Sequence, residues 1–367
     1  MDPPPPPPYE TRSSVFAANL QLAGGSTTRR REPPPYPRSL RVLCIEAGGG
    51  VRNLSQLFIL GEVMQNVKNR LPRSLTQIPK PCEFFDIIGG RGAGGIIAIL
   101  LGRLRMSVDE AIEAYKEIAS AAFRSHSSYI PWRPDFDAAA LEMKLNDIVT
   151  RRGLGDRMLD ADNPWHRWAE TVVFARVKTD LGVQPKTFRS YCIEGECHQD
   201  KEDTIIETVR DTTAQWPFFP PQRWLDMVFE PETRLDWAPH VALTEEARRL
   251  SLVKYGRKLE VTCSVSLGAG PPGRERDRAD RKLNEMCRSC DKAWGNTMLK
   301  DPSDPARTFE PSEVDWKPEH IRLSIIRGFG RISLDDWTKV DEVRDLAARY
   351  ARDSGLTVQR AARLIIS

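Results

Sequence analysis

The chain has 367 residues, of which 40% are hydrophobic and 29% charged, with a formal net charge of +3. This composition is ordinary for a globular domain, and so small a net charge argues against a nucleic-acid-binding surface. No run of about 18 apolar residues occurs, and the N-terminus lacks a basic segment followed by an apolar core, so we expect neither a transmembrane helix nor a secretory signal. Seven cysteines, an odd and sparse set, favour reduced thiols and a cytoplasmic location.

Residues 1–39 are rich in proline and lack the apolar side chains needed to bury a face, so we expect a disordered or polyproline-like arm. The arm contains the sequence PPPY twice, ending at Tyr9 and Tyr36. A polyproline helix is already ordered before binding, so such a motif can dock into the aromatic groove of a WW-domain protein. A solubilising tail is the alternative interpretation.

The folded part begins at Leu40 with a short apolar strand at residues 41–47, followed by three glycines at 48–50. Glycine tolerates backbone conformations that other residues avoid, so this is a turn. Apolar residues at helical spacing from Leu54 predict that a helix leaves the turn.

The same strand, turn and helix recur at residues 84–97, which read FFDIIGGRGAGGII. Residues 106–123 predict another helix, with Ser107 and Glu110 in a capping box. Further strands are predicted at 170–177 and 258–268.

A helix at residues 244–253 separates the last two strands, and an amphipathic helix closed by Gly355 is predicted near the end of the chain. Strands that alternate with helices favour a mainly parallel sheet covered on both faces. We therefore predict an α/β fold, a three-layer α/β/α sandwich, in a single domain at 40–355 with a short C-terminal tail at 356–367.

Residues Gly90 to Gly95 fit the G-x-G-x-x-G pattern of a dinucleotide-binding turn. That site also needs an acidic residue about 20 positions on, at the end of the next strand. Asp109, Glu110 and Glu113 have the spacing but lie in a helical pattern, so nucleotide binding is disfavoured.

A nucleophile elbow explains the glycines better, because it needs small residues two before and two after its apex. Gly90 and Gly94 flank an apex at Gly92, and Gly95 continues the turn. An elbow also needs backbone N–H groups that bind a developing oxyanion.

A triglycine turn from a neighbouring strand, Gly48, Gly49 and Gly50, is predicted to supply these groups. Arg52 is expected to reinforce this anion site electrostatically.

These motifs resemble, in order along residues 40–350, the patatin-like phospholipase family, of the kind common in fungi. Seven segments carry the resemblance: IEAGGGVRN (45–53), FFDIIGGRGAGG (84–95), MSVDEAIEAYKEI (106–118), FRSY (188–191), TTAQWPFFPP (212–221), VTCSVSLGAG (261–270) and IIRGFGRISLDDWTKVDEV (325–343).

The resemblance implies a lipid acyl hydrolase with a Ser–Asp dyad and no metal or other cofactor. The family's serine corresponds to Gly92, and its aspartate to a position near Pro231, where no D-G-G or D-G-A motif occurs. In the glycine-rich loop, the family's aspartate is replaced by Glu46 or Ala47, and its last glycine by Asn53.

Four acidic residues near Pro231 are alternatives for the missing aspartate: Asp226 and Asp236, which are out of register, and Glu230 and Glu232, which require a shifted loop. Among other nucleophiles and bases, we considered Ser55, Cys44, Cys82 and His240; the first three fit packing or helix-start roles better, and a base alone forms no covalent intermediate. The sequence therefore predicts a pseudoenzyme.

Three functions stay open: a lipid- or fatty acyl-binding or regulatory protein with at most peripheral membrane contact, a WW-recruited interaction protein, and an active acyl hydrolase in lipid metabolism with a non-standard nucleophile. Four apolar residues could line an acyl pocket: Val51, Ile96, Phe218 and Phe219. A zinc site would need Cys287 and Cys290 together with Cys192, Cys197 and His198, and one C-x-x-C without a matched pair favours no metal.

Overall fold

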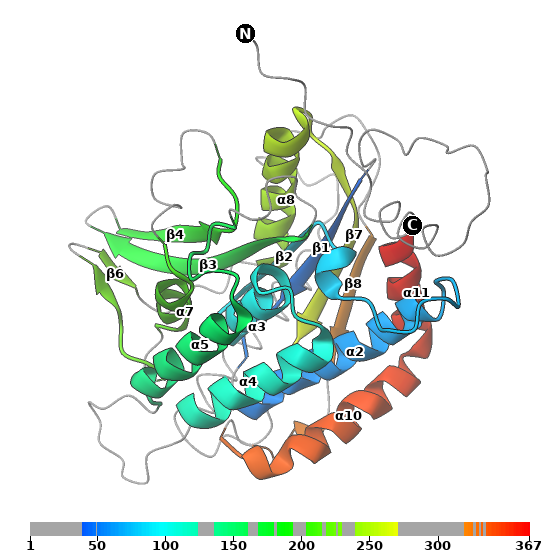
Figure 1. Ribbon diagram of the computed structural model, residues 1–367, viewed down its shortest axis with the longest axis horizontal. Helices are drawn as coiled ribbons and strands as arrows, with labels where there is room; N and C mark the ends of the chain where they lie inside the picture. The colour runs from blue at the N-terminus through cyan, green and yellow to red at the C-terminus, as the bar shows by residue number, and fades with distance from the viewer. Residues whose placement is uncertain are drawn as a thin grey trace, which may run out of the picture.

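Figure 1 shows the structure, a computed structural model of the chain. It describes residues 39–48, 50–123, 136–160, 168–179, 182–193, 203–214, 218–224, 227–229, 239–270, 319–325, 328–329, 332 and 335–367. Residues 1–38, which include Tyr9 and Tyr36, lie outside these ranges, so Ser39 alone of the proline-rich arm is described.

In the described part of the chain, eight strands form one sheet in the order β5-β6-β3-β2-β1-β7-β8, with β4 also paired to β3. The five strands from β3 to β8 run parallel, whereas β4, β5 and β6 pair antiparallel at one end. The strands are β1 (Ser39–Ile45), β2 (Ile87–Arg91), β3 (Glu170–Thr179), β4 (Gly182–Arg189), β5 (Arg223–Trp224), β6 (Met227–Phe229), β7 (Glu260–Gly268) and β8 (Glu319–Ser324).

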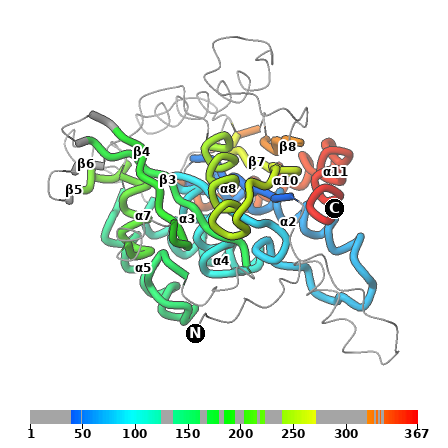
Figure 2. The backbone as a smooth tube through the Cα atoms, turned by 90° about the horizontal axis from the view of Figure 1, so that it is seen from above, coloured from blue at the N-terminus to red at the C-terminus, as the bar shows by residue number. Residues whose placement is uncertain are grey.

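Helices cover both faces of this sheet, which confirms the predicted α/β fold. The larger apolar core lies on one face, under α2 (Leu54–Lys68), α3 (Ala93–Ala98), α4 (Val108–Ala122), α5 (Ala138–Arg152), α7 (Ile205–Thr213), α10 (Val340–Asp353) and α11 (Gly355–Ile366). A smaller core lies on the opposite face, under α8 (Pro239–Tyr255). Figure 2 shows the sheet extending from β6 and β4 at one end to β8 at the other.

The connection from β1 through α2 to β2 sets the functional end of the sheet. The chain steps from β1 to β2 and β3 on one side, and returns to β7 and β8 on the other. The carboxyl ends of β1 and β7 therefore flank the point where the strand order reverses. Open α/β sheets bind their ligands in the crevice at this point.

The C-terminal segment differs from the prediction. The amphipathic helix ends at Asp353, and a second helix, α11, begins at Gly355. Residues 356–367, expected to be a tail, lie almost wholly in α11, which buries Val358, Ala361, Ala362 and Ile365 against the larger core. Gly355 is therefore not the end of the helical region, because the apolar spacing after it continues a helical pattern.

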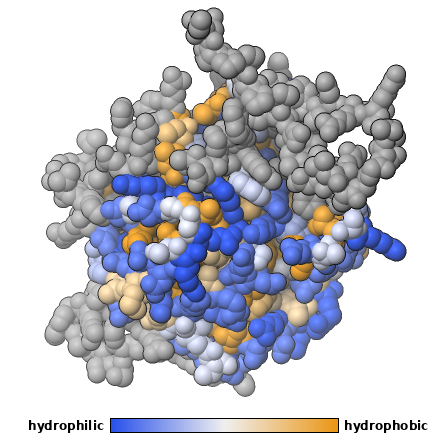
Figure 3. Space-filling model, in the orientation of Figure 1, coloured by the Kyte–Doolittle hydropathy of each residue, from blue (hydrophilic) through white to orange (hydrophobic). Residues whose placement is uncertain are grey.

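Hydrophobic side chains on the face in Figure 3 form scattered patches among hydrophilic ones. Among the described residues, no helix is both long and apolar enough to cross a membrane.

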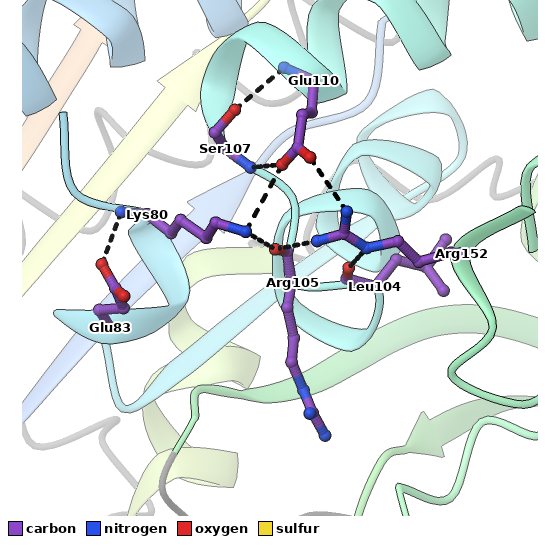
Figure 4. A network of polar contacts seen from close by, with 7 residues as sticks. All are labelled: Lys80, Glu83, Leu104, Arg105, Ser107, Glu110 and Arg152. Carbon is purple, nitrogen blue, oxygen red and sulfur yellow. Dashed lines mark hydrogen bonds and ion pairs between the residues drawn. The ribbon is translucent and has the colours of Figure 1, made fainter. Parts of the chain in front are cut away.

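A polar network ties the segment before β2 to the start of α4 and the end of α5 (Figure 4). The predicted capping box is confirmed: Ser107 Oγ accepts from Glu110 N–H, and Glu110 Oε2 accepts from Ser107 N–H at 2.7 Å. Lys80 and Arg152 both donate to the carbonyl of Arg105 and pair with Glu110. They thereby hold Arg105 at a positive φ of 52°.

Glu110→Gln tests this network through its pH dependence. Partial burial by itself raises the pKa of the Glu110 carboxyl, but the Ser107 N–H and the charges of Lys80 and Arg152 outweigh it and lower the pKa below 4.5. The stabilisation is therefore present above pH 4.5 and is lost as the pH falls through the folded-state pKa.

Because Glu110 is 44% exposed, we expect Glu110→Gln to lower the free energy of unfolding by less than about 1 kcal/mol at pH 7. In strong acid the substitution should have no effect. Urea unfolding at the two pH values measures both. Glu113→Gln, in the same helix but 69% exposed, is the control. An equal loss for Glu110→Gln at both pH values would contradict the prediction.

Candidate active site

Gly92 lies at the apex of a sharp turn between β2 and α3. Its backbone angles are φ 54° and ψ −133°, a conformation that side chains rarely adopt. A nucleophile elbow places its nucleophile on a strained turn between strand and helix, as here. The sequence analysis placed the apex at this residue, and the structure brings the turn to the carboxyl end of β2, beside β1.

The glycines on either side of the apex allow the helix to approach the sheet closely. A Cβ atom on Gly90 would lie 2.6 Å from the carbonyl oxygen of Ile45, and one on Gly94 would lie 2.4 Å from the same oxygen. A Cβ on Gly95 would lie 3.0 Å from Val173. The backbones of β1 and α3 therefore touch at positions where no side chain fits.

Gly92 differs from these glycines because its surroundings leave room for a side chain. A Cβ atom there would lie 3.8 Å from the Cβ of Ala47 and 3.9 Å from the carbonyl oxygen of Thr212. Only the positive φ disfavours a larger residue at Gly92. The elbow therefore has space for a nucleophile, and this chain carries none at that position.

Thr212, which the sequence analysis did not single out as a site residue, fixes the apex. Its Oγ1 accepts a hydrogen bond from Gly92 N–H at 2.8 Å and donates to the carbonyl of Phe174 at 2.6 Å. The hydroxyl thus links the turn to β3 and α7. In the sequence, its segment TTAQWPFFPP carries only the family resemblance and predicts no site residue.

The glycine loop after β1 lies next to the elbow. Gly48 packs against Ala269 and Asn53 so closely that a Cβ would lie 2.4 Å from the Cβ of Ala269. Gly50 has a φ of 57°, and its carbonyl accepts from Tyr115 Oη at 3.1 Å. Gly49 lies outside the described residues.

Arg52 is a buried residue that ties the glycine loop to a distant segment. Both Nε and Nη2 donate to the carbonyl of Ile332, in the segment before α10. Its electrostatic support of an oxyanion stays a prediction.

A buried polar cluster, missed by the sequence analysis, lies at the carboxyl ends of β1, β7 and β8. Glu46 Oε1 accepts from Ser266 Oγ at 2.8 Å and forms an ion pair with Arg322. No sequence signal places residues 46, 266 and 322 together, because their proximity depends on the strand order. Glu46, which with Ala47 is one of the two positions predicted to correspond to the aspartate of the resembled family, is thus paired with Arg322.

The position near Pro231 lies outside the described residues, as do Asp226, Glu230, Glu232 and Asp236. The helix that follows, α8, is described. Its Glu246 forms a buried ion pair with Arg189 and accepts from Tyr191 Oη at 2.7 Å. This carboxylate anchors α8 to Arg189, at the end of β4, and to Tyr191, two residues further along the chain.

The alternative nucleophiles are buried. Ser55 Oγ donates to the carbonyl of Arg52 at 2.7 Å, as a helix-start residue does. Cys44 and Cys82 are 0% exposed and take part in no disulfide. These environments favour the packing roles that the sequence predicted.

The aromatic residues Phe218 and Phe219 pack within the larger core. The Phe218 ring stacks on Phe136 at a centroid distance of 5.7 Å, and Phe219 meets Phe123 edge-on at 5.6 Å. Val51 and Ile96 belong to the same core. All four residues proposed for an acyl pocket therefore belong to the larger core.

Asp109 and Glu110 lie in the first turn of α4, and Glu110 belongs to the network at the far end of the sheet. No strand end presents them to the turn at Gly90–Gly95, which agrees with the rejection of a dinucleotide site. Cys197, His198, Cys287 and Cys290 lie outside the described residues. Within the described ranges, no group of three or more His, Cys, Asp or Glu residues is placed to hold a metal ion.

No family model matches the chain. A stretch of 153 residues, 41% of the chain, is 29% identical to human calcium-independent phospholipase A2-gamma. That stretch spans 18% of the human protein. The crystal structure of VipD from Legionella pneumophila superposes with a TM-score of 0.44 and 11% identity, over 89% of this chain and 67% of that one.

Alanine substitutions distinguish the roles of the three glycines. Gly92→Ala should cost about 1–3 kcal/mol in the free energy of unfolding, from backbone strain alone. Gly90→Ala and Gly94→Ala should cost more, because carbonyl groups of β1 must move to admit the methyl group. Urea unfolding of the three variants measures the order, and a Gly94→Ala variant as stable as Gly92→Ala would contradict the close approach.

Proposed function

We propose that this chain is a patatin-like phospholipase-fold protein that binds lipid acyl groups without hydrolysing them. The observation that carries the proposal is the apex at Gly92. The backbone there has the strained conformation of a nucleophile elbow, and the residue has no side chain.

An acyl hydrolase of this kind needs a hydroxyl or thiol at the apex to form the acyl-enzyme. Loss of the nucleophile in a serine hydrolase lowers turnover by about a millionfold. Pro231, at the mapped dyad position, has no carboxylate, and no D-G-G or D-G-A motif occurs around it. We therefore assign the chain a binding or regulatory role, as a pseudoenzyme of lipid metabolism.

Lipid is the favoured ligand class for two reasons. The similarity to a protein named as a phospholipase supports a lipid ligand. In addition, Gly90 and Gly94 keep the close approach of β1 and α3, which an elbow requires and which a decayed site would not need.

Hydrolysis and binding can be measured on one set of proteins: wild type, Gly92→Ser and Gly92→Ser/Pro231→Asp. We expect wild type to retain a fatty acyl ligand in native mass spectrometry and to release no fatty acid from phospholipid. The double variant should gain hydrolysis, because Gly92 leaves room for a side chain.

Wild-type hydrolysis that the variants do not change would favour the alternative, an active lipid acyl hydrolase with a different nucleophile. An absence of both ligand and hydrolysis in all three proteins would contradict the binding role and favour a scaffold.

A second proposed function is recruitment of a WW-domain protein by the arm, because PPPY occurs twice. Tyr9→Ala/Tyr36→Ala should abolish binding to an isolated WW domain, measured by isothermal titration. Each single variant should retain one site. Unchanged binding by the double variant would remove the arm from the account.

A further inference from the structure

Two histidines meet beneath the N-terminal end of α8. His240 is the second residue of α8 and is 2% exposed, and its ring centroid lies 6.2 Å from that of His320 on β8. The two rings are nearly perpendicular. A helix at the edge of the smaller core therefore touches β8 through a pair of titratable side chains.

The groups around this pair come from four elements. Arg322, on β8, is paired with Glu46 from the end of β1. Arg248, on α8, is paired with Glu245 and with Glu260 of β7. Each of these three carboxylates is therefore already paired with an arginine, with Arg248 shared by two of them, and a proton added to either histidine places a further cation among these arginines.

Burial, and then the charges of His320 and Arg322, together lower the pKa of His240 to about 3. Burial and then Arg248 lower the pKa of His320. Both folded-state pKa values thus lie below 6.5, so the neutral histidines stabilise the docked helix above pH 6.5. This stabilisation is lost progressively as the pH falls below that value.

The other attachments of α8 all lie on the smaller-core face of the sheet. Leu243, Ala247 and Leu250 pack on the smaller core, which lies on the opposite face of the sheet from the larger one. Glu246 adds the ion pair with Arg189. Release of α8 would therefore uncover this face of the sheet, whereas the contacts within the larger core do not involve the helix.

We propose that the contact between His240 and His320 is an acid-sensitive latch that releases α8 from the sheet at mildly acidic pH. This inference does not depend on the proposed function. For every pH unit below 6.5, each histidine raises the equilibrium constant for release of α8 by up to about tenfold, and the pair raises it by up to about a hundredfold.

Two buried cysteines report on the latch. Cys44 lies in the smaller core under α8, whereas Cys82 lies in the larger core, and both are 0% exposed. A pulse of 4,4′-dithiodipyridine, which modifies thiols in mild acid, should label Cys44 faster at pH 5 than at pH 7.5. Rates are read by peptide mass spectrometry and divided by those of the unfolded chain at each pH.

We expect at least a tenfold rise in the normalised rate for Cys44 and no rise for Cys82. Labelling of both cysteines in parallel would show acid unfolding of the whole domain and would overturn the latch. Labelling of neither would show that α8 stays docked and would overturn it equally.

Variants separate the histidines from Glu246, the other titratable group that anchors α8. His240→Gln/His320→Gln removes both titrating rings and should leave the Cys44 rate independent of pH. Glu246→Gln should keep the pH dependence. If the histidine variant retained the full pH dependence of Cys44 labelling, the proposal would be wrong. The comparison of Cys44 with Cys82 in the wild-type protein tests the latch even where a variant fails to fold.

Discussion

The structure depends on one close approach, between the end of β1 and the start of α3. The carbonyl oxygen of Ile45 lies where side chains on Gly90 and Gly94 would have to be, so the helix reaches the sheet only because both residues are glycines. This contact fixes the position of the turn at Gly92, beside Ala47 and the glycine loop. Two turns, from β1 and β2, thereby lie side by side, next to the point where the strand order reverses.

The same geometry leaves the apex without a nucleophilic side chain. Gly92 has space for a side chain that would complete the elbow, and the Thr212 hydroxyl still holds its N–H group. Nearby, Glu46 is committed to Ser266 and Arg322, and Arg52 to Ile332. The polar groups at this end of the sheet serve to hold the backbone in place, which suits a binding site better than a catalytic one.

Local sequence signals predicted much of the fold. Glycine turns, apolar runs and the capping box at Ser107 depend on neighbours in the chain, and the structure has the expected strands and helices at β1, β2, β3, β7, α2, α4 and α8. The short strands β5 and β6 and the added strand β8 depend on pairing with distant residues, so no local pattern marked them. In the site, the apex could be read from glycine spacing, whereas the Glu46 cluster and Thr212 required the order of the strands. The hydrogen bonds of Arg52 to Ile332 could not be predicted, because sequence shows a charge but not the direction of a side chain.

The central claim is that the elbow backbone persists around a residue that cannot attack an ester. Intact-mass measurement after treatment with a fluorophosphonate, which reacts with activated serines, tests this claim most directly. The account predicts no adduct on wild type, and one adduct on Gly92→Ser/Pro231→Asp that maps to position 92. An adduct on wild type would contradict the account, because it would reveal a working nucleophile elsewhere in the chain.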